Sequence, residues 1–272
     1  LVGFGVVIDQ PRGAQGAFGT VYRVKRDFDD RVLAGKLFRK DPSAPYPEMA
    51  DRALRQEVKA LESLTHPNIV RVLGPIPVTS QGEWMIISEW IDGSTLDDYT
   101  DGPKAMNGAA IFQAGAQLLA ALAYLEDKGV VHRDLKPANV MIDNGALKVI
   151  DFNLTRDTGR DTMIAGTPAY MPPDFLAQAS STDSFVDRYG AAIMLYQLIV
   201  GQHPYAASLN NGGRPSIGTP PADPRTLRPE LSSELAAFMV KSVAPRESER
   251  FNSAYEMADA WAALSDDITK LA

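Results

Sequence analysis

The chain of 272 residues has no cysteine, few histidines and no excess of basic residues. The lack of cysteine excludes disulfide bonds, thiolate metal sites and cysteine nucleophiles. The three histidines, His66, His132 and His203, are too few for a histidine-rich metal site. Lys and Arg number 27 against 34 Asp and Glu, and the formal net charge of -7 gives no support for nucleic acid as a partner.

Long hydrophobic runs are also scarce. The longest apolar run, Gly190 to Gly201, is interrupted by Gln197, and it is too short to cross a bilayer. The first residues have no signal-peptide pattern, and the chain begins at Leu1 rather than Met. We therefore expect a cytoplasmic protein with no membrane contact within this chain, which can be one domain of a larger protein.

The hydrophobic pattern changes along the chain from that of strands to that of helices. Short β-prone runs are separated by polar turns, near residues 21–24, 32–38, 69–73 and 84–88. Helical periodicity is seen in 48–64, 111–128, 191–200, 232–243 and 253–264, while 206–230 is rich in Pro, Gly and Asn and predicts a loop. The boundary between the β-rich part and the mainly helical part is expected near Glu89–Gly93.

One hairpin can be predicted together with its register. Asn144-Gly145 lies between two apolar runs, 140–142 and 147–150, and is a strong hairpin signal. This centre pairs residue 140 with 149 and 139 with 150, so Asn139 and Asp151 should lie side by side at the open end. A carboxylate and an amide oxygen can share a hard cation such as Mg²⁺. The alternative for this polar stretch is a loop with Asx turns.

Three features of the first 60 residues admit two interpretations each. The glycines Gly16 and Gly19 allow backbone N–H groups to approach phosphate, or they form a structural turn. Lys36 lies in an apolar strand, where its side chain either points to solvent or has an acidic partner. Glu57 lies on the apolar stripe of its helix or at the edge of that stripe, and an unpaired carboxylate on the stripe would be costly. Pairing Lys36 with Glu57 would resolve both positions.

The sequence from His132 to Asn139, His-Arg-Asp-Leu-Lys-Pro-Ala-Asn, resembles the catalytic loop of eukaryotic-type (Hanks-type) serine/threonine protein kinases. The resemblance extends from the Gly-rich loop to Arg250 in the order typical of the family. It implies an α+β, two-lobed kinase fold, with a small β-rich N-lobe at 1–88 that includes one key helix, a hinge at 89–93 and a larger helical C-lobe at 94–272. It also implies ATP with Mg²⁺ or Mn²⁺, and Ser/Thr hydroxyls of proteins as acceptors.

The resemblance assigns roles to three residues of the catalytic loop and to two residues that follow it in the chain. Asp134 would accept or orient the substrate hydroxyl proton, and Lys136 would stabilise the phosphoryl group. Thr167 resembles the threonine that contacts both residues. Asn139 and Asp151 would hold the metal ion.

The remaining implied roles concern the nucleotide. Lys36 would grip the α- and β-phosphates and would be held by Glu57. Ser88 stands at the gatekeeper position, and its small side chain predicts tolerance of bulky adenine analogues. The nucleotide-binding set is Gly16, Gly19, Val21, Ala34, Lys36, Ser88, Glu89, Ile91, Met141 and Ile150. A stacked apolar spine would consist of Leu61, Val72, His132 and Phe152.

Four positions depart from the family pattern. Ala14 replaces the first glycine of the Gly-rich loop, and Asp151-Phe152-Asn153 replaces Asp-Phe-Gly. Asp174 replaces a glutamate and is expected to pair with Arg250. The place of an aspartate five residues before Gly190 is taken by Phe185, and the choice between its neighbours Asp183 and Asp187 is left open. Asn153 and the compact loops resemble those of bacterial members.

The resemblance also suggests regulation and leaves two alternatives. Arg133 resembles the arginine that pairs with an activation-segment phosphate, and the candidate autophosphorylation sites are Thr155, Thr158 and Thr162. One alternative function is that of a pseudokinase, a nucleotide-binding scaffold without turnover. Another is a small-molecule phosphotransferase of similar fold.

Overall fold

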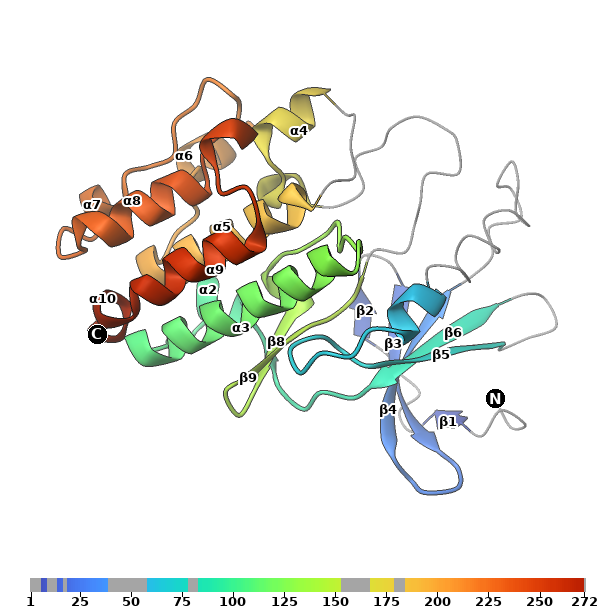
Figure 1. Cartoon of the computed structure of the whole chain (residues 1–272). Helices are drawn as coiled ribbons and strands as arrows, with labels where there is room; N and C mark the ends of the chain where they lie inside the picture. The colour runs from blue at the N-terminus through green and yellow to red at the C-terminus, as the bar shows by residue number, and fades with distance from the viewer. Residues whose placement is uncertain are drawn as a thin grey trace. The chain divides into compact units, whose positions relative to one another are not determined.

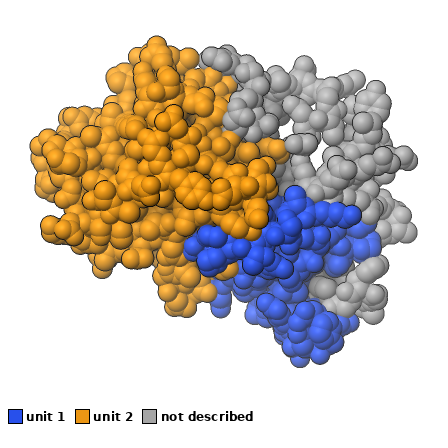
Figure 2. Space-filling model, in the orientation of Figure 1, with its two compact units in different colours: residues 1–92, 154–162 blue, residues 93–153, 163–272 orange. Residues whose placement is uncertain are grey.

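The computed structural model describes residues 6–8, 14–16, 19–38, 58–77, 83–152, 167–178 and 184–271 (Figure 1). These residues divide into two compact units, one that ends at Asp92 and one that begins at Gly93 (Figure 2). The first is built on an antiparallel sheet and the second is mainly helical.

The sheet of the N-terminal unit has the strand order β1-β3-β4-β6-β5, and β2 also pairs with β3. Its strands are β1 (Val6–Ile8), β2 (Ala14–Gly16), β3 (Gly19–Arg26), β4 (Val32–Phe38), β5 (Val72–Pro77) and β6 (Trp84–Glu89). A helix is described over residues 58–62, within the predicted helical stretch. The strand runs 21–24, 32–38 and 84–88 are therefore confirmed.

The strand predicted at 69–73 is wrong in its bounds, because β5 begins at Val72 and extends to Pro77. Gly74, Pro75 and Pro77 disfavour strands in general, and this hid the strand in the sequence. Proline is tolerated at the edge of a sheet, and β5 is an edge strand among the described residues. Gly74 has a φ of 124°, at a register shift between Val72 and Gly74.

The two faces of this sheet differ in character because side chains alternate along each strand. Val24, Leu33, Met85 and Ile87 are buried together and form the core on one face. Residues on the opposite face follow from the register: Val21 lies opposite Lys36, and Ala34 lies opposite Ser88.

The C-terminal unit is arranged around α3 (Gly108–Asp127), which packs against α5 (Phe185–Val200), α9 (Ala254–Ala263) and α10 (Ser265–Thr269). The side chain of Asn107 accepts the N–H of Ala110 and caps the helix, and Gly129 follows its end with a φ of 64°. Of the described helices, α3 alone is long and apolar enough to cross a membrane, but 56% of its most apolar window is buried inside the protein, as in a core helix.

The other elements of this unit are short. They are β7 (Ser94–Thr95), α2 (Asp97–Thr100), η1 (Pro137–Asn139), β8 (Val140–Asp143), β9 (Ala146–Val149), η2 (Pro168–Tyr170), α4 (Pro173–Gln178), α6 (Ala206–Asn210), α7 (Pro224–Leu227), α8 (Ser233–Ser242) and η3 (Glu247–Glu249). The region 206–230, predicted as a loop, therefore contains two helical segments. Asp223 caps the second of them by accepting the N–H of Arg225, a local signal that its many Pro and Gly neighbours obscured.

Candidate active site

The β8–β9 hairpin has the register that the sequence predicts. Val140 pairs with Val149, and the N–H of Ile150 donates to the carbonyl of Asn139 at 2.9 Å. The turn residues Asn144 and Gly145 have φ values of 48° and 83°, which is why this dipeptide suits the turn. Asn139 therefore lies across from the residue that precedes Asp151.

A glutamine that the sequence analysis missed holds this hairpin from α3. The amide nitrogen of Gln117 donates to the carbonyl of Gly145, and its oxygen accepts the N–H of Leu147, both at 2.9 Å. A polar residue on a largely apolar helix was the available signal, but only the fold shows that it faces the hairpin.

Asp134, Lys136 and Thr167 form one hydrogen-bonded cluster. Lys136 Nζ lies 2.9 Å from Asp134 Oδ2 and donates to Thr167 Oγ1 at 2.8 Å. The N–H and the hydroxyl of Thr167 both donate to Asp134 Oδ1, at 3.0 and 3.1 Å. The Asp134 side chain is only 2% exposed, and burial with these partners fixes its orientation. The structure thus brings together three residues that are up to 33 positions apart in the chain.

Asn139 is oriented so that its side-chain oxygen remains for a cation. Its amide nitrogen donates to the backbone carbonyl of Asp134 at 2.7 Å and to the Asp134 carboxylate at 3.1 Å. An amide oxygen and the Asp151 carboxylate are hard ligands that suit Mg²⁺. No group of three or more His, Cys, Asp or Glu is placed to hold a metal ion in the described part of the chain, so the rest of such a coordination shell would come from phosphate and water.

Asp187 answers the question that the sequence left open on α5. Its carboxylate accepts the N–H of His132 at 2.6 Å and the N–H of Arg133 at 2.9 Å. Arg133 has a φ of 68°, a costly conformation for a non-glycine residue, and these bonds help to hold it. Burial raises the pKa of the Asp187 carboxyl, while the two N–H bonds act in the opposite direction. Phe185 packs against Phe175 instead.

His132 packs in the core beneath the loop and also holds the start of the segment after β9. Its ring lies 4.7 Å from that of Phe152, and its Nε2 is 2.7 Å from the carbonyl of Ile150. The next residue, Asp151, has a φ of 63°. Two of the four predicted spine residues are therefore in contact within this unit.

Asp174 pairs with Arg250, as the sequence predicts. The guanidinium Nη2 reaches both carboxylate oxygens, at 3.0 and 2.9 Å, and Nη1 donates to the carbonyl of Ala244. The carboxylate also accepts the N–H of Glu247 at 2.6 Å. The shorter aspartate therefore preserves the ion pair and ties α4 to η3.

Residues predicted to bind the nucleotide are divided between the units. In the sheet, Gly16 pairs with Gly19, and Val21, Ala34, Lys36 and Ser88 share one face. Met141 lies on β8, and Ile150 follows β9. The predicted residues Glu57, Asn153, Thr155, Thr158 and Thr162 lie outside the described residues.

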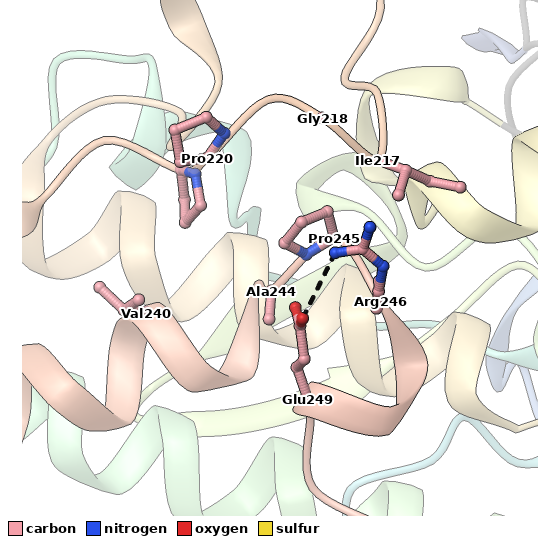
Figure 3. A pocket seen from close by; sticks show the side chains of 9 residues that line it. Ile217, Gly218, Pro220, Val240, Ala244, Pro245, Arg246 and Glu249 are labelled. Carbon is pink, nitrogen blue, oxygen red and sulfur yellow. Dashed lines mark ion pairs between the residues drawn. The ribbon is translucent and has the colours of Figure 1, made fainter.

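A groove of about 330 Å³ lies elsewhere on the C-terminal unit (Figure 3). It is lined mainly by apolar side chains around Pro220, Val240 and Pro245, with the Arg246–Glu249 ion pair, at 3.5 Å, on its wall. Among the described residues, no predicted site residue lines it.

The fold is kinase-like. It has a β-sheet unit, a helical unit, and a loop that brings together Asp134, Lys136 and Asn139. Solved structures have the same fold. The structure of Rad53 1–466 in complex with AMP-PNP superposes on this chain with a TM-score of 0.77 and 24% sequence identity. The match covers 96% of this chain and 66% of the Rad53 chain. The Mycobacterium tuberculosis PknI kinase domain matches 95% of each chain at a TM-score of 0.71 and 23% identity. Both confirm the expected α+β kinase fold.

Sequence comparisons establish the family. The family described as "Protein kinase domain" matches residues 13–262. The serine/threonine-protein kinase PknB of Mycolicibacterium smegmatis is 32% identical over 260 residues, which cover 86% of this chain and 38% of PknB. Serine/threonine-protein kinase 36 of Pongo abelii is 30% identical over 239 residues, 86% of this chain and 18% of that protein. The chain belongs to the protein kinase domain family, whose members use ATP and a divalent metal ion, and it spans less than two fifths of either relative.

Proposed function

We propose that this domain transfers the γ-phosphoryl group of ATP to Ser or Thr hydroxyls of proteins. The observation that carries the proposal is the Asp134–Lys136–Thr167 cluster, in which a buried carboxylate is held by a lysine and a threonine. The similarity to PknB and to kinase 36, both named serine/threonine-protein kinases, supports this acceptor class.

The role proposed for each residue is the one that the resemblance to the kinase family implies. Asp134 would orient the acceptor hydroxyl and take its proton, while Lys136 would offset negative charge on the phosphoryl oxygens. Asn139 and Asp151 would hold Mg²⁺ or Mn²⁺, and Lys36 with Glu57 would bind the nucleotide phosphates. ATP with its metal ion supplies the transferable group when bound. We place this activity in the cytoplasm, where ATP and reduced proteins are available.

Labelled ATP tests this function against its alternatives. The wild-type chain and Asp134→Asn are incubated with γ-labelled ATP, Mg²⁺, a Ser/Thr peptide library and a metabolite extract, and nucleotide binding is measured in parallel. We expect label on peptides with the wild type, at least about 100-fold less with the variant, and similar nucleotide binding for both. Binding without label would identify a scaffold, and label on a metabolite would identify a small-molecule phosphotransferase.

The small side chain of Ser88 supports a second proposal about the nucleotide site. Ser88 lies opposite Ala34 in the sheet, on the face that also carries Lys36. A pocket bounded by two small side chains should admit an enlarged adenine. We expect an N6-benzyl ATP analogue to compete with ATP in the wild type and to fail in Ser88→Phe. If the analogue does not compete in the wild type while ATP still binds, Ser88 is not the gatekeeper residue.

Autophosphorylation at Thr155, Thr158 or Thr162 is a further proposal. It rests on Arg133, whose backbone is fixed next to Asp134 and whose guanidinium suits a phosphate group. Phosphosite mapping after ATP incubation should find at least one of the three in the wild type and none in Asp134→Asn. If all three stay unmodified in an active enzyme, the proposal is wrong.

A further inference from the structure

All three histidines of the chain share one local hydrogen bond. In each, ring Nδ1 accepts the backbone N–H two residues later: Asn68 to His66 at 3.2 Å, Asp134 to His132 at 3.3 Å and Tyr205 to His203 at 3.0 Å. A neutral imidazole that accepts at Nδ1 carries its proton on Nε2. Each ring therefore has one N–H donor, at Nε2, and for His132 and His203 it faces a backbone carbonyl.

Two of these donors hold the two ends of one segment. His132 Nε2 lies 2.7 Å from the carbonyl of Ile150, which precedes Asp151. His203 Nε2 lies 2.9 Å from the carbonyl of Ala169, which follows Thr167 by two residues. The chain between Asp151 and Thr167 thus starts and finishes at a histidine contact, although only His132 belongs to the catalytic-loop motif.

His203 is well placed to fix the turn that carries Thr167. The bonds of η2 use the carbonyls of Thr167 and Pro168, and the Ala169 carbonyl goes to His203. The ring of Tyr170 meets that of His203 edge to face at 5.8 Å, and its hydroxyl donates to Gln197 Oε1 on α5 at 3.0 Å. Because Thr167 uses its side chain on Asp134 and Lys136, it does not cap η2, and the turn depends on contacts from outside.

We propose that His203 is a positioning residue that fixes η2 through the Ala169 carbonyl, so that Thr167 reaches Asp134 and Lys136. The inference rests on the proposed kinase function, since the contacts it positions are those of the catalytic cluster. Where the chain is described, the other ionisable groups that face the ring are Tyr170, Tyr205 and, more distantly, Asp101. Burial lowers the pKa of His203, whereas the Ala169 carbonyl and Asp101 act in the opposite direction. Protonation at Nδ1 would set an N–H against the N–H of Tyr205.

Two substitutions distinguish the roles of the two ring nitrogens of His203. Gln at position 203 can place a donor near the position of Nε2, while Asn can only replace the Nδ1 acceptor. We expect His203→Asn to lower kcat by between about 10-fold and 100-fold, and His203→Gln to stay within about threefold of the wild type. The KM for ATP should not change in either variant. His66→Asn is the matched control, because it makes the same replacement at a histidine with the same local bond in the other unit, and its kcat should equal that of the wild type.

Amide hydrogen exchange gives a readout that does not need activity. The N–H of Thr167 donates to Asp134, and it should exchange faster in His203→Asn but not in His203→Gln or His66→Asn. The inference would be overturned if both His203 variants lost the same share of kcat in proportion to their folded fractions. It would also be overturned if His203→Asn kept both the kcat and the Thr167 exchange rate of the wild type. A wild type that labels no peptide would contradict the proposed function instead, and the exchange data would then decide on His203 alone.

Discussion

The catalytic loop and the N-terminal sheet place their predicted site residues by different means. In the loop, specific hydrogen bonds fix the side chains: Asn139 and Thr167 hold Asp134. In the sheet, the strand register puts Lys36 opposite Val21. The loop should therefore respond sharply to the loss of one polar partner, whereas the sheet should respond to changes in packing and pairing.

The largest effect is expected at Asp187, which supports the loop from α5. Asp187→Ala leaves the N–H groups of His132 and Arg133 without their acceptor in a buried site, so we expect a loss of about 3–5 kcal/mol in the free energy of unfolding and a steep fall in kcat. Asp187→Asn retains one acceptor oxygen and should lie between this variant and the wild type. Urea unfolding and steady-state kinetics test both, and an unchanged midpoint for the alanine variant would contradict the prediction.

The ion pair of Asp174 and Arg250 comes next. Their side chains are 15% and 5% exposed, and Arg250→Ala leaves a largely buried carboxylate unpaired, which should cost about 3 kcal/mol. Arg246→Ala is the control, because its pair with Glu249 is 57% and 46% exposed and should contribute less than about 1 kcal/mol. Similar thermal midpoints for the two variants would show that burial does not set the difference.

A smaller effect is expected at Gln117. Gln117→Leu removes both bonds to the hairpin and should lower the free energy of unfolding by about 1–2 kcal/mol. Because the hairpin carries Asn139 and leads to Asp151, the Mg²⁺ concentration needed for half-maximal activity should rise several-fold. Gln113→Leu on the same helix is exposed and should change neither quantity. A Mg²⁺ requirement that stays at the wild-type value would limit Gln117 to a role in stability.

The smallest effect concerns pH. Burial lowers the pKa of His203, so between that pKa and the ordinary value of 6.5 the unfolded chain binds more protons than the folded one. This contribution to stability is fully present above pH 6.5 and declines as the pH falls below it. The difference in unfolding free energy between the wild type and His203→Gln should therefore shift against the wild type from pH 7.5 to pH 5.5. A difference that is constant across this range would contradict the assignment.

Local patterns predicted much of the fold and of the loop. The hairpin register followed from Asn144-Gly145, whereas the cluster around Asp134 was expected from the resemblance of the catalytic-loop motif and Thr167 to the kinase family. Two contacts between distant elements did not follow from the sequence: Gln117, 28 residues from Gly145, was missed, and Asp187, 55 residues from His132, was left as one of two candidates. The edge strand β5 was misplaced because propensity disfavours proline, whereas its position in the sheet permits it.

Pro75 and Pro77 of β5 affect how this domain can associate with other β-sheets. Proline has no backbone N–H. Because Pro75 and Pro77 are two residues apart, their missing N–H groups belong to the same side of β5. The pairing of β5 with β6 on the other side is retained. The unpaired side of β5 consequently offers few backbone N–H groups to a strand of another protein. At high local concentration, the sheets of identical domains are therefore hindered from pairing edge to edge through β5, the edge strand among the described residues.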